Sequence, residues 1–234
     1  MALYDVATHF ADGLYRNIVS IRVSQNLSDD LGDDAIDSEL FNRFEMDTKP
    51  RRPVPAVNRP FEAGYGQAIL FPFVHKPWFE TRFSDGTYPV WYGSLDLETT
   101  VHETVHHFRR RHIEEAGFQH ARQPIIGERK IYLVACDALL IDLRRKLHEA
   151  PDLINPDSYT FCHQVGRELQ SRRHPGLLTR SARCPGDNAA LFDPVYLTNP
   201  RDLCFLTYRY MTGTGPGTGM VEVERTPGEV WLRL

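Results

Sequence analysis

Hydrophobic residues near the start of the chain recur every three or four positions, which is the spacing of one face of a helix. The first group comprises Val6, Phe10, Leu14, Ile18 and Ile21, and the second comprises Leu40, Phe41 and Phe44. This pattern predicts helical structure over residues 3–46.

Four prolines follow this region: Pro50, Pro53, Pro55 and Pro60. Proline fixes the backbone and removes a donor, so no helix is expected to cross this segment. We therefore predict an N-terminal helical extension over residues 1–50 and one main domain over residues 51–234.

The main domain alternates short strand patterns with two helical patterns. Strands are predicted at residues 90–92, 131–135, 176–179, 189–192, 204–210 and 221–223, with a further strand or a short turn at 139–143. One helix begins after a cap at Ser94 or Asp96, reaches about residue 115 and stops at Gly117, and a second covers residues 158–173. Because a regular strand–helix repeat is missing, the pattern predicts an α+β fold.

Composition narrows the choice of protein class. The chain has 234 residues, 41% of them hydrophobic, enough for one substantial core. Its net charge of −4, with an acidic run at residues 29–39, argues against a general DNA-coating protein and against direct nucleic-acid binding.

Neither a signal peptide nor a membrane span is recognisable, so we expect a cytoplasmic protein without membrane contact. The cysteines are widely spaced and form no C-x-x-C pair, which argues against a zinc ribbon or a disulfide framework.

The helix at residues 97–108 carries the strongest chemical candidate. Its predicted buried stripe consists of Leu97, Val101, Thr104, Val105 and Phe108. Glu103 lies off this stripe and therefore faces either solvent or a cleft.

The same helix contains an H-E-x-x-H pattern formed by His102, Glu103 and His106. Two histidines on one helical face can bind zinc, with the glutamate activating a water molecule. A catalytic zinc normally takes three protein ligands, and Arg109, Arg110 and Arg111 follow where an extended motif needs other residues. A zinc metallopeptidase is therefore the alternative hypothesis, and no bound metal is expected.

The Gly-rich run at residues 213–219 resembles a phosphate-binding loop only superficially. A following helix and a Lys-Ser/Thr pair are both missing, so a flexible hairpin turn is the preferred interpretation.

Three separated segments resemble, in order and spacing, the RES-domain family. They are E-T-R-F-S-D-G followed by P-V-W-Y-G-S at residues 80–94, L-E-T-T-V-H-E at residues 97–103, and the segment at residues 176–194. The likeness covers residues 75–210. Carried over by residue, the family's namesake Arg, Glu and Ser are Arg82, Glu103 and Ser181, and Tyr92 matches its active-site tyrosine.

This resemblance implies a fold, an activity and a partner. The fold is expected to be ADP-ribosyltransferase-like, with a mixed or antiparallel sheet and flanking helices. Such proteins are toxins of bacterial toxin–antitoxin pairs that deplete NAD⁺ or transfer ADP-ribose. The resemblance therefore implies NAD⁺ as a substrate, no separate cofactor, and a cognate antitoxin of the Xre type.

The residue types fit this chemistry. A carboxylate at Glu103 can stabilise the oxocarbenium-like ribosyl cation left when nicotinamide departs. Arg82 and Arg183 can bind a pyrophosphate bidentately, and Tyr92 can stack on nicotinamide. Ser181 can orient its neighbours, and Asn188, in the third segment, is also assigned to substrate binding.

An NAD⁺-consuming toxin is therefore the leading hypothesis. Water, phosphate or a protein side chain could capture the cation, and the sequence does not choose among them. A non-catalytic binding module that works through its acidic face is a second alternative.

Overall fold

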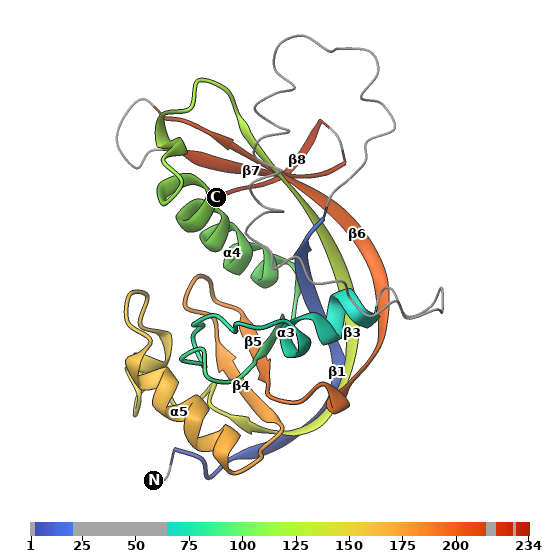
Figure 1. The fold of residues 1–234 in the computed structure, drawn as a ribbon, viewed down its shortest axis with the longest axis vertical. Coiled ribbons are helices and arrows are strands. Elements are labelled where there is room, and N and C mark those ends of the chain that lie inside the picture. Colours follow the sequence, from blue (N-terminus) through green and yellow to red (C-terminus); the bar gives the residue numbers. More distant parts are fainter. Residues whose placement is uncertain (1–2, 21–64, 214–218, 227) are drawn as a thin grey trace. The chain divides into compact units, whose positions relative to one another are not determined.

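The computed structural model describes residues 3–20, 65–213, 219–226 and 228–234 (Figure 1). The chain divides into two compact units. Unit 1 comprises Met1–Arg16, Pro53–Glu103 and Tyr132–Asp202, and unit 2 comprises Asn17–Arg52, Thr104–Ile131 and Leu203–Leu234.

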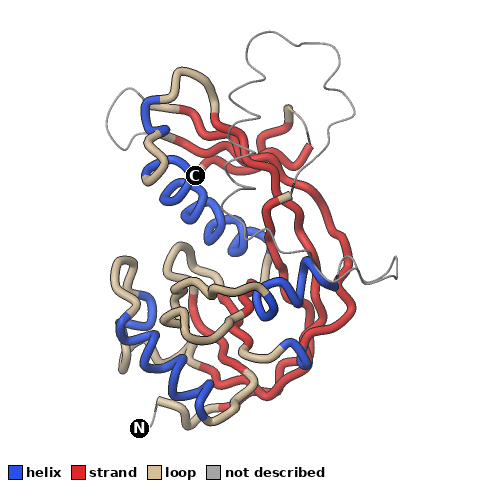
Figure 2. Tube along the Cα trace, viewed as in Figure 1, coloured by secondary structure: helices blue, strands red, loops and turns tan. Residues whose placement is uncertain are grey.

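The described residues form eight strands in a mixed sheet of order β1-β2-β5-β4-β3-β6-β7-β8, and β1 also pairs with β3. The strands are β1 (Ala7–Val19), β2 (Trp91–Ser94), β3 (Ile125–Asp142), β4 (Gly176–Arg180), β5 (Asp187–Leu191), β6 (Leu197–Met211), β7 (Met220–Thr226) and β8 (Glu229–Arg233). Strands β3 and β4 are parallel, whereas β2, β4 and β5 pair antiparallel. Helices and strands both contribute (Figure 2), which confirms the predicted α+β class.

The helical segments are short. They are η1 (Gly66–Leu70), α3 (Phe71–Val74), α4 (Leu97–His107), η2 (Phe108–Glu114), η3 (Phe118–His120), η4 (Pro151–Ile154), α5 (Thr160–Ser171) and η5 (Pro194–Tyr196). None of the described helices combines the length and the apolar character needed to cross a bilayer.

The helix predicted at the start of the chain is wrong for its first part, because Ala7–Val19 is strand β1. Val6, Phe10, Leu14 and Ile18 are four residues apart, which is also twice the two-residue repeat of a strand. The spacing therefore fits one face of either element. The second predicted helix, the proline-rich connection and the boundary at residue 50 lie outside the described residues.

Most elements predicted in the main domain are confirmed, with changed ends. The patterns at residues 131–135 and 139–143 belong to one long strand, β3, and not to a strand and a turn. Helix α4 becomes π-helical at Phe108, and Gly117, with φ of 81°, ends the helical region as expected. Strand β8 was not predicted, and most of the Gly-rich run lies outside the described residues.

Unit 1 has a front and a back face, which follow from the strand register. Ser94 pairs with Asn188 and Thr179 pairs with Asn188, so these three side chains share the front face. Arg180 pairs with Asp187, one position along each strand, and therefore lies on the back face.

Helix α5 covers the front face of unit 1, where it lies along β4 (Figure 1). Cys162, Val165 and Leu169 of α5 pack in one cluster with Leu177 and Ala190 of the sheet. Full burial of one such aliphatic side chain contributes about 1.5–3 kcal/mol.

The back face of unit 1 contacts the segment of η1 and α3. Trp91 is fully buried, and its indole nitrogen donates to the carbonyl of Ala68 at 2.6 Å. Covering both faces fixes β2 and β5, the two strands that carry part of the candidate site.

Unit 2 contains a separate polar cluster. Asn17 donates to the hydroxyls of Thr104 and Tyr208, each at 2.8 Å. The guanidinium of Arg129 lies 5.3 Å from the Tyr208 ring centre. Burial raises the pKa of Tyr208, so its phenol stays neutral at ordinary pH.

Candidate active site around Glu103

Helix α4 places Glu103 in unit 1. Asp96 caps the helix, because its Oδ1 accepts from the Thr99 backbone N–H and its Oδ2 accepts from the Thr99 hydroxyl, both at 2.7 Å. Of the two predicted caps, Asp96 is therefore confirmed. Val101 is fully buried and Glu103 is half-buried, as the predicted stripe requires.

One oxygen of the Glu103 carboxylate is held by two side chains. Its Oε1 accepts a hydrogen bond from the Ser181 hydroxyl and one from the Asn188 amide, each at 2.7 Å. Among the described residues, no hydrogen bond reaches the other oxygen, Oε2. Three residues predicted as site residues therefore meet in one cluster, which leaves one carboxylate oxygen available to a ligand.

The Ser181 hydroxyl is oriented by its own loop, which joins β4 to β5. Its oxygen accepts from the backbone N–H groups of Arg183 (3.0 Å) and Cys184 (3.3 Å), so its proton is directed to Glu103. Gly186 closes the loop, because its carbonyl accepts from the Ser181 N–H at 2.8 Å.

Gly186 also brings this loop against the first turn of α4. A side chain at this position would overlap the Thr99 hydroxyl, which the Asp96 cap holds in place. The glycine therefore sets the close approach of the loop to the helix that carries Glu103.

Ser94 orients the Asn188 amide, a role that the sequence did not indicate. The buried Ser94 hydroxyl donates to Asn188 Oδ1 at 2.7 Å, which turns the amide N–H₂ toward Glu103. The sequence pattern indicates Ser94 only as a possible helix cap. Its position at the end of β2, opposite Asn188, is a consequence of strand pairing.

The two arginines predicted to bind phosphate both contact Tyr159. The Arg82 guanidinium lies 4.6 Å from the Tyr159 ring centre, and one Arg183 N–H group donates to the Tyr159 hydroxyl at 3.5 Å. Backbone carbonyls hold both arginines as well: those of Leu153 and Asn155 hold Arg82, and that of Pro156 holds Arg183. No hydrogen bond between described residues joins Arg82 directly to Glu103.

The Tyr92 hydroxyl holds the turn that carries Arg82. It makes a hydrogen bond with the Thr81 hydroxyl and accepts from the Phe83 N–H, both at 2.9 Å. Burial raises the pKa of Tyr92 well above its usual range, so the phenol remains neutral. Tyr92 thus fixes the residues on either side of Arg82, and its stacking on nicotinamide stays a prediction.

The zinc motif has no third ligand in the part of the chain that the structure describes. No group of three or more His, Cys, Asp or Glu side chains there could hold a metal ion. His102 Nε2 lies 3.8 Å from the Glu98 carboxylate, one turn earlier on the same helix.

Comparison with known proteins identifies a family match across this site. A family model described as RES domain matches residues 57–210. Among solved structures, the chain is similar to one chain of the M. tuberculosis MbcT–MbcA toxin–antitoxin complex, with a TM-score of 0.46 and 12% sequence identity. That match covers 84% of this chain and 86% of the other. No match was found among curated proteins.

Proposed function

Because the chain belongs to the RES-domain family, we propose that it is a toxin that consumes NAD⁺ by cleaving the nicotinamide–ribose bond. The family match includes every residue assigned to the site: Arg82, Tyr92, Glu103, Ser181, Arg183 and Asn188. NAD⁺ is the substrate in this proposal, and no cofactor is required.

The proposal rests on the carboxylate of Glu103. Ser181 and Asn188 occupy its Oε1 and fix its orientation, which leaves Oε2 as the acceptor for a ribose hydroxyl. When the bond between ribose and nicotinamide breaks, the electron pair leaves with neutral nicotinamide and positive charge develops on the sugar. A fixed carboxylate stabilises that charge more strongly in the transition state than in the ground state.

Arg82 and Arg183 are the proposed partners of the NAD⁺ pyrophosphate. Tyr159 and nearby carbonyls hold both guanidinium groups within unit 1, so each is restrained before a ligand arrives. Pre-organised guanidinium groups lose less side-chain freedom when they bind an anion.

Water, phosphate or a protein side chain can each capture the ribosyl cation. Water would release ADP-ribose and a proton, phosphate would give a phosphorylated ADP-ribose, and a side chain would become ADP-ribosylated. Identifying the product therefore decides between glycohydrolase, phosphorylase and transferase activity.

The test compares the purified chain with its Glu103→Gln variant in the presence of NAD⁺. Glutamine keeps the size and the Oε1 acceptor but removes the charge, so we expect nicotinamide release to fall about 10²- to 10³-fold while NAD⁺ still binds. Chromatography would quantify nicotinamide, and calorimetry would measure NAD⁺ binding.

Glu98→Gln on the exposed side of the same helix is the matched control and should retain activity. Nicotinamide release near the wild-type level by Glu103→Gln would contradict the proposal. A parallel assay with a chelator tests the zinc alternative. Loss of activity together with loss of a bound metal would favour the zinc metallopeptidase.

We further propose that a cognate antitoxin of the Xre type restrains this chain in the cytoplasm. An enzyme that consumes NAD⁺ without restraint would halt its own cell, so the family likeness implies a partner that blocks the site.

A further inference from the structure

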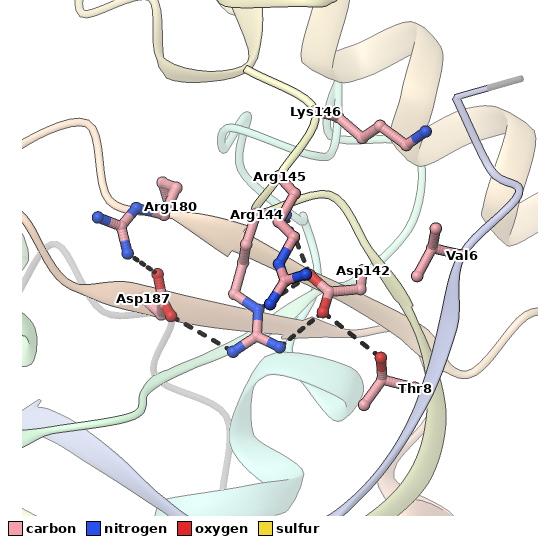
Figure 3. Close-up of a pocket in the computed structure, with 8 residues that line it drawn as sticks. All are labelled: Val6, Thr8, Asp142, Arg144, Arg145, Lys146, Arg180 and Asp187. Atoms are coloured by element: carbon pink, nitrogen blue, oxygen red, sulfur yellow. Dashed lines mark hydrogen bonds and ion pairs between the residues drawn. The ribbon is translucent and has the colours of Figure 1, made fainter. Parts of the chain in front are cut away.

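The back face of unit 1 carries a charged cavity of about 580 Å³ (Figure 3). The strand register places Asn188 of the candidate active site on the opposite face of the sheet. Its lining residues are Val6, Thr8, Asp142, Arg144, Arg145, Lys146, Arg180 and Asp187. Among the described residues, no side-chain hydrogen bond joins this lining to Glu103, and the strand register separates the two faces.

Two of the cavity's arginines are fixed by carboxylates. Arg144 donates from Nε and from one terminal N–H₂ group to the two oxygens of Asp142, at 2.9 and 2.6 Å. Arg180 donates to Asp187 at 2.9 Å, and Arg144 also reaches Asp187 at 3.4 Å. The guanidinium of Arg144 holds the pKa of Asp142 below its usual range, so the Arg144–Asp142 pair is ionised at neutral pH.

The positive charge of the cavity exceeds the negative charge that compensates it. Lys146 is already paired, because it lies 2.7 Å from Asp5 and 3.8 Å from Glu149. Arg145 is exposed and makes no ion pair with any described residue. Three guanidinium groups therefore surround two carboxylates, which leaves one net positive charge at the cavity.

We propose that this cavity binds a small phosphate-bearing anion through Arg144, Arg145 and Arg180. The planar guanidinium presents paired N–H groups that match phosphate oxygens, and the fixed pairs with Asp142 and Asp187 hold two of the three groups in place. Among the described residues, the lining contains no aromatic ring that could stack on a nucleobase. The volume falls within the usual range for small-ligand pockets and exceeds what one phosphate needs, which favours a pyrophosphate group.

Two residues of the cavity, Arg180 and Asp187, are adjacent in sequence to the two donors to Glu103. Arg180 and Asp187 are the last paired residues before the loop between β4 and β5. The next residue on one strand is Ser181 and on the other is Asn188, the two donors to Glu103. A ligand that competes with Asp187 for Arg180 therefore acts one residue away from both donors.

The test measures binding directly and does not depend on NAD⁺ turnover. Calorimetric titration of the full chain with pyrophosphate, in buffer free of phosphate and NAD⁺, should show saturable binding, and the variants assign that binding to the back face. Arg145→Gln, which removes an exposed and unpaired charge, should weaken that binding about tenfold or more without changing the melting temperature. Arg172→Gln, an exposed arginine on the far end of α5, is the matched control.

Pyrophosphate can also bind the arginines proposed for NAD⁺, so Arg82→Gln separates the two sites. We expect the back-face site to persist in Arg82→Gln and to be lost in the double variant Arg145→Gln/Arg180→Gln. The proposal is overturned if the folded wild-type chain binds no pyrophosphate at millimolar concentration, if Arg145→Gln binds as well as wild type, or if Arg82→Gln alone abolishes binding. Equal affinity for acetate would likewise show that the cavity does not recognise phosphate.

Discussion

Ser94 decides which end of the Asn188 amide faces Glu103. The two ends of an asparagine amide have nearly the same shape, so packing alone does not distinguish them. Because the Ser94 hydroxyl donates to Oδ1, the N–H₂ group must point toward the Glu103 carboxylate. With the amide turned the other way, two oxygens would face each other and the Glu103 oxygen would lose one of its two donors.

Replacing Ser94 with alanine should therefore reduce kcat about twofold to tenfold and leave KM nearly unchanged. The estimate follows from the loss of one hydrogen bond of about 0.5–1.5 kcal/mol that positions a group in the transition state. Steady-state kinetics of nicotinamide release would measure the split between kcat and KM.

Ser94→Thr retains a hydroxyl and should restore most of the rate, whereas Ser171→Ala, at the exposed end of α5, should behave like wild type. A fall in melting temperature without any change in kcat would assign Ser94 a structural role only.

Arg82→Lys keeps the positive charge but loses the planar group that lies over Tyr159 and bonds two carbonyls. If Arg82 binds pyrophosphate, KM for NAD⁺ should rise about tenfold, because an ammonium cannot replace a guanidinium fork. Arg172→Lys on the exposed side of α5 serves as the control in the same kinetic assay. A KM equal to that of wild type would remove Arg82 from the substrate site and leave it as a support for the segment before α5.

The sequence predicted Glu103, Ser181 and Asn188 as site residues, and the structure brings their side chains together, but the contacts of Ser94 and Tyr159 could not be predicted. The first three lie in ordered segments whose spacing carries the family likeness. Ser94 and Tyr159 act through contacts between residues distant in the sequence, to Asn188 and to Arg82. Nothing in the local pattern around either residue distinguishes it from an ordinary serine or tyrosine.

At the scale of elements, the turn that carries Arg82 is held between β2 and α5. Tyr92 from β2 bonds Thr81 and Phe83, and His163 from α5 makes a 2.8 Å hydrogen bond with the Thr81 carbonyl. Gly166 of α5 faces the Phe83 carbonyl so closely that a side chain there would overlap it. The position of Arg82 therefore depends on the close packing of a helix against a turn.

Gly166→Ala tests this packing, because two effects predict opposite changes in the free energy of unfolding. Helix propensity alone would stabilise α5 by about 1 kcal/mol. The added methyl group must instead displace the backbone of the turn, and such overpacking costs about 1–3 kcal/mol. Since backbone cannot move aside as a flexible side chain can, we expect a net loss of stability in urea denaturation.

Gly66→Ala is the matched control, because a methyl group at that position meets no atom within 4 Å. Because Gly66 lies in the helical segment η1, helix propensity acts there without a clash, and the control should unfold at the wild-type urea concentration or slightly above it. Stabilisation of the chain by Gly166→Ala would show that α5 is not packed tightly against the turn.

The contrast between β1 and α5 shows why one element was mispredicted and the other was not. In α5 the buried residues Cys162, Val165 and Leu169 are separated by three and then four positions, a spacing that only a helix places on one face. In β1 the hydrophobic residues are separated by four positions each, which a strand also places on one face. Only pairing with β2 and β3 distinguishes the two, and that pairing is absent from the local sequence.

At the scale of the molecule, the strand order could not be predicted from sequence patterns. The sequence predicted short strands and an α+β fold, yet β2 pairs with β5 and β3 pairs with β4, across long separations in the chain. This order places Ser94 beside Asn188 and assembles the Glu103 cluster from a helix, a strand and a loop. The residues of the candidate site could therefore be predicted from motifs, whereas their geometry required the fold.

The proposed NAD⁺-consuming activity leads to a prediction for a living cell. If the proposal holds, induced expression of the wild-type chain without its antitoxin should lower cellular NAD⁺ and halt growth, because a cell depends on this redox carrier. Glu103→Gln, expressed to the same soluble level, should leave both growth and NAD⁺ unchanged, since the fixed carboxylate charge is lost while Ser181 and Asn188 keep an oxygen to bond. Co-expression of a cognate Xre-type antitoxin should restore growth to cells that contain the wild-type chain.

Growth curves and enzymatic assays of NAD⁺ would follow all three strains, with the amount of folded chain measured in each. Unimpaired growth at normal NAD⁺ levels, with abundant folded wild-type chain and no antitoxin, would contradict the proposed toxin activity.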